Sequence, residues 1–223
     1  MLTRVLEPEV MDDVTEAHAY DALDHAEVNR QFVDDLLATG ALRGELLDLG
    51  TGTALIPIAL MRRLGKDADL RVTAIDASLA MLDVAQANLE LADLVGRLWL
   101  EQCDAKALPF DDDRFAIVIS NSLVHHVADP IGPLREAHRV TAPGGRLFFR
   151  DLLRPEDEQQ LAQLVATYAG DADDCQRRLF ADSLRAALRL DEVRALVAEF
   201  GAPVTSLAAT SDRHWTWSYT KPN

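Results

Sequence analysis

The sequence predicts an α/β protein with a Rossmann-like, doubly wound, mainly parallel seven-stranded sheet, an antiparallel C-terminal strand and a helical lid insert. Short, almost wholly apolar segments alternate with segments of helical periodicity, which indicates a parallel sheet covered on both faces. The leucine-rich residues 45–49 run directly into Gly50-Thr51-Gly52 and then into a helical segment. This strand, tight turn and helix are the start of a Rossmann-type unit. Residues 204–210 and 214–219 flank a Ser-Asp turn, which predicts an antiparallel pair at a sheet edge.

The 223 residues are expected to form a single domain. It consists of an N-terminal helical cap (1–44), a core (45–151), a helical insert (152–201) and a C-terminal strand pair (202–223). Strands are expected at 45–50, 70–76, 97–103, 115–121 and 146–151, with a turn at 142–145. Helices are expected at 12–38, 54–61, 78–91 and 133–140. Most of 155–200 is also expected to be helical, with a break around Gly170-Asp171.

Composition argues against several kinds of partner. The formal net charge of −15 would repel a phosphate backbone, so we expect no binding to nucleic acid. The N-terminal 20 residues carry acids where a signal peptide would be basic and then apolar, and no apolar run reaches the roughly 20 residues of a membrane span. Cys103 and Cys175 suggest reduced thiols rather than a disulfide framework. These features predict a cytoplasmic protein, and they say nothing about its oligomeric state.

The turn after the first strand narrows the class of ligand. A dinucleotide fingerprint needs a small residue three positions after its second glycine, and that position is Leu55. Asp48 lies just before the turn, where its carboxylate would repel phosphates but could hold a cationic amine directly or through water. A cofactor that carries an amino acid therefore fits better than NAD, and a nicotinamide-dependent oxidoreductase is disfavoured.

The residues Leu47-Asp48-Leu49-Gly50-Thr51-Gly52-Thr53 resemble the first motif of class I S-adenosylmethionine-dependent methyltransferases, in particular the type 11 methyltransferase domain family. The similarity continues through the second strand (72–78), the acid and Leu-Pro-Phe segment (103–110), the fourth strand (115–120) and the Pro-Gly-Gly turn with its preceding helix (136–146). These motifs occur in the family's order and together cover residues 45–151.

The resemblance implies S-adenosylmethionine as cofactor and S-adenosylhomocysteine as product. Asp76 would accept hydrogen bonds from the ribose hydroxyls, or else serve as a helix N-cap. Asp104 would accept one from the adenine amino group, or else be a simple turn acid. Met81 would lie against the adenine face, or else only pack in the core. Tyr20 would close over the methionine end of the cofactor, or simply pack in its helix. The implied cofactor-binding residues are Tyr20, Asp48, Gly50, Thr51, Gly52, Asp76, Ala77, Met81, Asp104, Ala105 and Asn121.

The implied reaction is an in-line methyl transfer that depends mainly on alignment and exclusion of water. If the acceptor is a hydroxyl, His125 or His126 could be a general base, although this His-His sequence also serves as scaffold in the family. Arg150 and Asp151 could bind a polar or acidic acceptor, or form an ion pair that fixes the lid. His25 and Asn29 are further candidates for facing the pocket. No His, Cys or Asp cluster has the sequence spacing of metal ligands, so no metal is expected.

Two functions remain open at this stage. The first is methylation of a small organic molecule, with the acceptor and its O, N, C or S atom unspecified. The second is a non-catalytic protein that binds S-adenosylmethionine, such as a sensor. Trp215, Trp217 and Tyr219 fall on one face of the last strand, either as core residues or as an aromatic wall for a substrate.

Overall fold

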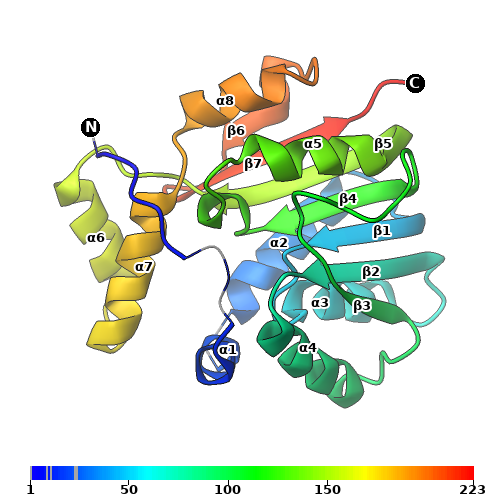
Figure 1. Cartoon of the computed structure of the whole chain (residues 1–223), viewed down its shortest axis with the longest axis horizontal. Coiled ribbons are helices and arrows are strands. Elements are labelled where there is room, and N and C mark those ends of the chain that lie inside the picture. Colours follow the sequence, from blue (N-terminus) through cyan, green and yellow to red (C-terminus); the bar gives the residue numbers. More distant parts are fainter. Residues whose placement is uncertain (1, 9, 11, 23–24) are drawn as a thin grey trace. The chain divides into compact units, whose positions relative to one another are not determined.

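The computed structural model describes residues 2–8, 10, 12–22 and 25–223, and its strands form a seven-stranded sheet of order β3-β2-β1-β4-β5-β7-β6 (Figure 1). β1 pairs in parallel with both β2 and β4, and β2 pairs in parallel with β3. β6 and β7 pair antiparallel, as predicted. The strands are β1 (Gly44–Leu49), β2 (Leu70–Asp76), β3 (Leu98–Gln102), β4 (Phe115–Asn121), β5 (Thr141–Leu152), β6 (Leu207–Ala209) and β7 (His214–Thr220).

The described chain forms two compact units. The larger unit, which we call the core unit, comprises Val10–Asn121, Gly132–Phe149 and Ser218–Asn223, and the smaller, the insert unit, comprises Met1–Glu9, Ser122–Ile131 and Arg150–Trp217.

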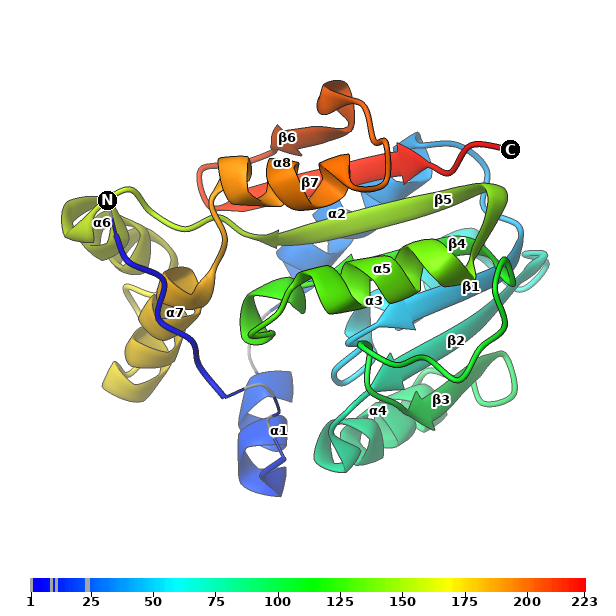
Figure 2. The same cartoon turned by 45° about the horizontal axis from the view of Figure 1, so that its top comes forward.

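The apolar runs of the sequence explain the core unit. Leu46, Leu47 and Leu49 of β1 are fully buried, because β1 has a strand on each side and helices over both faces. Helices α3 and α5 lie on opposite faces of the parallel strands, with α2 beside α3 (Figure 2). The helices involved are α1 (Val14–Asp21), α2 (Ala26–Ala38), α3 (Leu55–Leu64), α4 (Leu79–Leu91) and α5 (Ile131–Val140).

Two details of the core unit differ from the sequence prediction. The helix predicted over 12–38 is two helices, since α1 ends at Asp21 and α2 begins after His25; the predicted residues 23–24 lie outside the described residues. The turn predicted at 142–145 lies within β5, which begins at Thr141. Gly144 adopts φ 72° there and donates its N–H to the Lys221 carbonyl at 2.9 Å, so the chain bends without leaving the ladder.

The insert unit has the helical content that the sequence predicts. Its helices are α6 (Glu158–Tyr168), α7 (Asp174–Ala186) and α8 (Leu190–Ala198), and the chain between α6 and α7 includes the predicted break at Gly170-Asp171. Leu161 and Leu164 of α6 pack with Leu184 of α7 and with Leu152 at the end of β5.

The aromatic residues of β7 are core residues. Trp215 and Trp217 are 1% and 0% exposed, and the Phe200 ring stacks on Trp217 with centroids 5.8 Å apart. Thr216, on the other side of the strand, is also buried, so both faces of β7 are covered. The core interpretation is confirmed.

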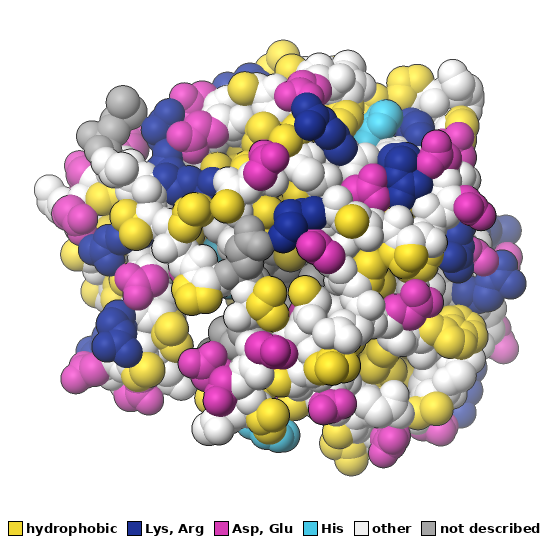
Figure 3. Space-filling view, in the orientation of Figure 1, with side chains coloured by type: hydrophobic (Ala, Val, Ile, Leu, Met, Phe, Trp, Pro, Cys, Tyr) yellow, Lys and Arg dark blue, Asp and Glu magenta, His cyan; other side chains and the backbone are white. Residues whose placement is uncertain are grey.

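Two surface features bear on partners. No helix among the described ranges is long and apolar enough to cross a lipid bilayer. On the face of the molecule shown in Figure 3, Asp and Glu side chains are interspersed with Lys and Arg, and no extended basic patch appears there.

Candidate active site

The turn after β1 brings backbone N–H groups to the carboxyl end of the sheet. Gly50 and Gly52 adopt φ values of 68° and 54°, in the left-handed region that glycine enters without a Cβ penalty. Between them, Thr51 donates its N–H to the Ile75 carbonyl of β2 at 2.9 Å. The turn is thus bonded to the neighbouring strand, next to the position where ligands bind in open parallel sheets.

Asp76, at the end of β2, connects this turn to helix α4. Its Oδ2 accepts the Gly52 N–H at 2.8 Å, and its Oδ1 accepts the Ser78 N–H at 2.9 Å. The N-cap of α4 is Ser78, as predicted, because its hydroxyl accepts the Met81 N–H at 3.1 Å. A carboxylate oxygen has more than one lone pair, so Asp76 can hold the turn and still accept hydrogen bonds from a ligand.

Asp48 is a buried acid, only 3% exposed. Burial, together with the negative charge of Asp76, raises the pKa of its carboxyl to about 7. Within the described part of the chain no ion pair joins Asp48 to a Lys, Arg or His side chain. A cationic ligand group would therefore supply the positive charge that this carboxylate lacks.

An apolar cluster covers the same region from α1 and α4. Ala17, Ala80, Met81 and Val84 are buried together, and Tyr20 packs against them. A Cβ built on Gly52 would lie 3.9 Å from the Tyr20 ring, which places Tyr20 beside the glycine turn. The structure thus brings together two predicted residues, Tyr20 and Met81, that are distant in sequence.

Other predicted cofactor residues lie at neighbouring strand ends. The Asp104 side chain is 53% exposed, its Oδ1 accepts the Lys106 N–H at 2.8 Å, and Lys106 Nζ lies 3.5 Å from its Oδ2. These contacts are those of a turn acid, the alternative interpretation, and the adenine role of Asp104 stays a prediction. Ala105 is buried, Ala77 accepts a hydrogen bond from Gln102 Nε2 through its carbonyl at 3.0 Å, and Asn121 is half-buried at the end of β4.

His25 lies in the core unit at the N-cap of α2, and its role towards an acceptor stays a prediction. Its Nε2 lies 3.1 Å from the Tyr20 carbonyl, and the two rings are 4.7 Å apart. With Asn29, it lines a groove between α2 and α3 whose floor includes Val33 and Ile58.

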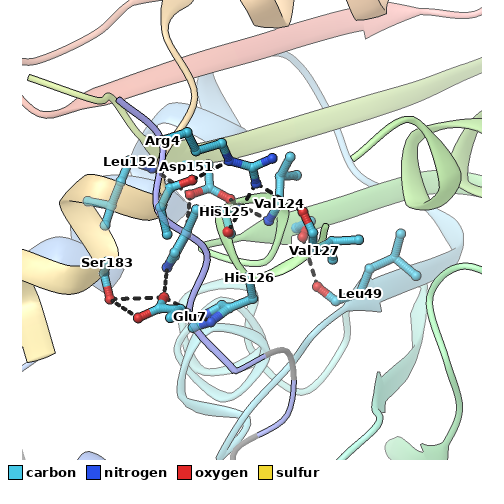
Figure 4. A network of polar contacts seen from close by, with 12 residues as sticks. Arg4, Glu7, Leu49, Val124, His125, His126, Val127, Asp151, Leu152 and Ser183 are labelled. Atoms are coloured by element: carbon cyan, nitrogen blue, oxygen red, sulfur yellow. Dashed lines mark hydrogen bonds and ion pairs between the residues drawn. The ribbon is translucent and has the colours of Figure 1, made fainter. Parts of the chain in front are cut away.

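In the insert unit, Asp151 and His125 form a buried pair (Figure 4). Asp151 Oδ1 lies 2.5 Å from His125 Nδ1, and its Oδ2 accepts the Val124 N–H at 2.5 Å. The Leu152 N–H also donates to Asp151 Oδ1, at 2.6 Å. Arg150 is buried too and donates through Nε to the Thr216 hydroxyl at 3.0 Å. The binding of an acceptor by Arg150 and Asp151 stays a prediction.

Glu7 is a largely buried acid beside both histidines that the sequence interpretation did not single out. Its Oε1 lies 3.3 Å from His125 Nε2 and 3.0 Å from His126 Nδ1, and the Ser183 hydroxyl donates to its carboxylate at 3.2 Å. Burial opposes ionisation of Glu7, but hydrogen bonds to both histidines lower its pKa to about 2. Burial likewise opposes the charged form of His125, yet Asp151 and Glu7 raise its pKa to about 9.

Comparisons with known proteins decide the family. Residues 47–149 match the family model of a methyltransferase domain. The chain is 31% identical over 200 residues to the 27-O-demethylrifamycin SV methyltransferase of Amycolatopsis mediterranei, covering 88% of this chain and 66% of that protein. It is 30% identical to the ubiquinone/menaquinone biosynthesis C-methyltransferase UbiE of Marinomonas sp., covering 72% of this chain and 67% of that protein. The chain belongs to the S-adenosylmethionine-dependent methyltransferases.

A solved structure supports the fold of this methyltransferase. The SAM-dependent methyltransferase from Aquifex aeolicus superposes with a TM-score of 0.69 at 17% identity, over 94% of this chain and 98% of that one. The chain spans about two thirds of the length of the two curated relatives named above.

The residues of this methyltransferase fit its cofactor, S-adenosylmethionine. The buried acid Asp48 lacks a cationic partner among the described side chains, which suits the cofactor's ammonium group. The Asp76 carboxylate lies at the glycine turn, where hydroxyl donors of a ribose could reach it. An apolar surface formed by Tyr20 and Met81 lies beside that turn.

Proposed function

We propose that this methyltransferase transfers the methyl group of S-adenosylmethionine to a small organic acceptor in the cytoplasm. Support comes from the relatives, whose names describe methylation of a rifamycin precursor and a step in ubiquinone/menaquinone biosynthesis. The net charge of −15 disfavours nucleic acid as acceptor, and two cysteines that are not in a disulfide, Cys103 and Cys175, agree with a reducing compartment.

The main support for the proposal is the pair of carboxylates at the glycine turn, those of Asp48 and Asp76. Asp48 would hold the cofactor's amine, and Asp76 would accept the ribose hydroxyls while it keeps the turn in place. Tyr20 and Met81 would cover the ligand's apolar surfaces, and Asp104 would reach the adenine amino group if it exchanges its contact with Lys106. Gly50, Thr51, Gly52, Ala77, Ala105 and Asn121 would line the remainder of the site.

When bound, S-adenosylmethionine supplies a methyl group already activated by a sulfonium. The chain then has to align the acceptor with that methyl group and exclude water, so proximity and orientation provide most of the rate increase. We do not assign His125 a base role, because both of its ring nitrogens face carboxylates. His126 remains a candidate base only if Glu7 releases it. Asp151 would support the acceptor side through the Val124 backbone that it holds, and Arg150 through the Thr216 hydroxyl.

The test is a methyl-transfer assay on a panel of small acceptors that offer hydroxyl, amine, thiol and activated carbon groups. We expect S-adenosylhomocysteine to form with at least one acceptor, together with a product heavier by one methylene unit. Binding of S-adenosylhomocysteine without turnover of any acceptor would favour the non-catalytic alternative. Methylation confined to RNA or DNA would contradict the proposed acceptor class.

Replacing Asp76 by alanine should weaken S-adenosylhomocysteine binding by about 1–3 kcal/mol, the range for hydrogen bonds to a charged partner. The variant loses the ligand's acceptor and also frees the N–H groups of Gly52 and Ser78. Calorimetric titration measures the affinity, and Asp83→Ala, an exposed acid on the same helix α4, is the matched control. An unchanged affinity in Asp76→Ala would remove the ribose assignment.

A further inference from the structure

Three potential metal-ligand atoms converge in the insert unit (Figure 4). They are Glu7 Oε1, His125 Nε2 and His126 Nδ1, and all lie within 4.8 Å of one another. No other group of three or more His, Cys, Asp or Glu side chains in the described ranges has this geometry. Glu7 comes from the N-terminal segment, whereas the histidines belong to the 3-10 helix η1 (Val124–His126) after β4.

Two of the three spacings match tetrahedral coordination, and the third is at most 4.8 Å. Zinc binds imidazole nitrogen and carboxylate oxygen at about 2.0–2.1 Å in tetrahedral geometry, so its ligand atoms lie about 3.3 Å from one another. Glu7 Oε1 is 3.3 Å from His125 Nε2 and 3.0 Å from His126 Nδ1. Both histidine nitrogens face the same carboxylate oxygen, so a small movement of the side chains would admit an ion among the three atoms.

The contact between His125 and Asp151 prepares the first histidine for this role. Asp151 lies against Nδ1, which directs the Nε2 atom of His125 towards Glu7. Histidine ligands of metals usually donate their second ring nitrogen to a carboxylate in this way. Asp151 is itself fully buried and held by the backbone N–H groups of Val124 and Leu152, so the imidazole orientation is rigid.

The N-terminal segment is anchored independently of Glu7. Arg4 donates through Nε to the Ala186 carbonyl at 2.7 Å and through Nη2 to the Val127 carbonyl at 2.9 Å. The Ser183 hydroxyl from α7 bonds to both oxygens of the Glu7 carboxylate at 3.2 Å. The third ligand is therefore held near the histidines by contacts that need no ion.

We propose that Glu7, His125 and His126 form a binding site for a divalent transition-metal ion of the zinc class. Two nitrogen ligands and one oxygen ligand favour zinc or cobalt over magnesium and calcium, which prefer oxygen alone. The two carboxylates of Glu7 and Asp151 balance the double charge of the ion. Three protein ligands leave one coordination position for water or an added ligand, and the ion crosslinks the N-terminal segment to η1. The proposal does not depend on the identity of the acceptor, but an ion bound to His126 would exclude that residue as a general base.

The experiment uses tag-free full-length protein, stripped with a chelator and then titrated with Zn²⁺, Co²⁺ or Mg²⁺ by calorimetry. We expect one Zn²⁺ per chain, a tetrahedral Co²⁺ absorption spectrum, and no Mg²⁺ binding. Loss of an outer-sphere carboxylate costs about 10–100-fold in metal affinity. The ligand variants Glu7→Gln and His126→Ala should each lose more Zn²⁺ affinity than that. His18 is an exposed histidine of α1, so His18→Ala should bind Zn²⁺ as tightly as wild type.

Thermal unfolding provides a second readout that does not depend on activity. Zn²⁺ should raise the Tm of wild type and of His18→Ala by mass action, and should leave the Tm of His126→Ala unchanged. His126 is 30% exposed, so its replacement is expected to fold even if Glu7→Gln does not. Equal Zn²⁺ affinity in wild type and His126→Ala, or no stoichiometric binding, would mean an adventitious cation only and would overturn the proposal.

Discussion

Replacing the buried Asp151 by asparagine is expected to lower the free energy of unfolding by about 3–5 kcal/mol, the range for breaking a buried charge pair. The Asp151 carboxylate receives hydrogen bonds from the N–H groups of Val124 and Leu152 and faces His125 Nδ1. An asparagine has one acceptor oxygen, and its NH₂ group would point a donor at one of these donors. The variant therefore leaves buried N–H groups unpaired and removes the charge that stabilises His125.

Urea denaturation in chelator-treated buffer measures this effect without any contribution from a bound ion. Asp104→Asn is the control, because the Asp104 side chain is 53% exposed and such substitutions usually change stability by less than about 0.5 kcal/mol. If the free energy of unfolding fell by the same small amount in both variants, Asp151 would not be the residue that holds the η1 segment in place. If the free energy of unfolding fell more in Asp104→Asn than in Asp151→Asn, Asp104 would contribute more to stability than its exposure suggests.

The sheet and the cluster of residues at the glycine turn could be predicted because their signals are local. A buried parallel strand needs a continuous apolar run, and residues 46–49 and 115–119 provide such runs with an acid only at Asp48. Parallel strands end at the same edge, so polar residues that follow them, such as Asp76, are placed together by topology alone. The structure adds that Asp76 also holds the turn of Gly52, a contact that no spacing in the sequence indicates.

The contacts of Glu7 and Asp151 in the insert unit were less predictable because they join distant segments. Glu7 lies in a segment without helical or strand periodicity, and its contact with His125 depends on how the chain packs. The two adjacent histidines by themselves do not have the sequence spacing of metal ligands. Glu7, the third potential ligand, therefore could not be predicted from the sequence. Arg150 was predicted at the acceptor side from its position after an apolar strand, yet its guanidinium bonds to Thr216 of β7.

Asp48→Asn is expected to have the opposite effect on stability from Asp151→Asn. The pKa of Asp48 is raised from its ordinary value near 3.8 to about 7, mainly by burial. An acid with a raised pKa in the folded state loses stability as the pH rises from its unfolded pKa to its folded pKa, because the folded form must give up a proton that it holds more tightly. An asparagine at this position does not titrate, so the variant avoids this loss.

The stability advantage of Asp48→Asn over wild type should therefore grow with pH. Between about pH 5.5 and about pH 8.5 the growth is expected to be about 2 kcal/mol, since each pKa unit corresponds to about 1.36 kcal/mol. Urea denaturation of both proteins without cofactor at the two pH values measures it, and all other titrating groups cancel in the difference. A constant difference at both pH values would mean that Asp48 ionises with an ordinary pKa.

The same variant should bind S-adenosylhomocysteine more weakly, by about 1.5–3 kcal/mol, because an amide cannot form the charged hydrogen bond to the ligand's ammonium group. For wild type, binding below about pH 7 should release a proton, since the carboxyl must ionise to meet that group. Calorimetry in two buffers of different ionisation enthalpy detects this proton, and Asp48→Asn should not release it. A variant that is more stable and binds as tightly as wild type would show that Asp48 is a buried acid with no part in holding the cofactor. A variant that is more stable but binds the ligand poorly would show that the Asp48 carboxylate lowers the stability of the fold and contributes to ligand binding.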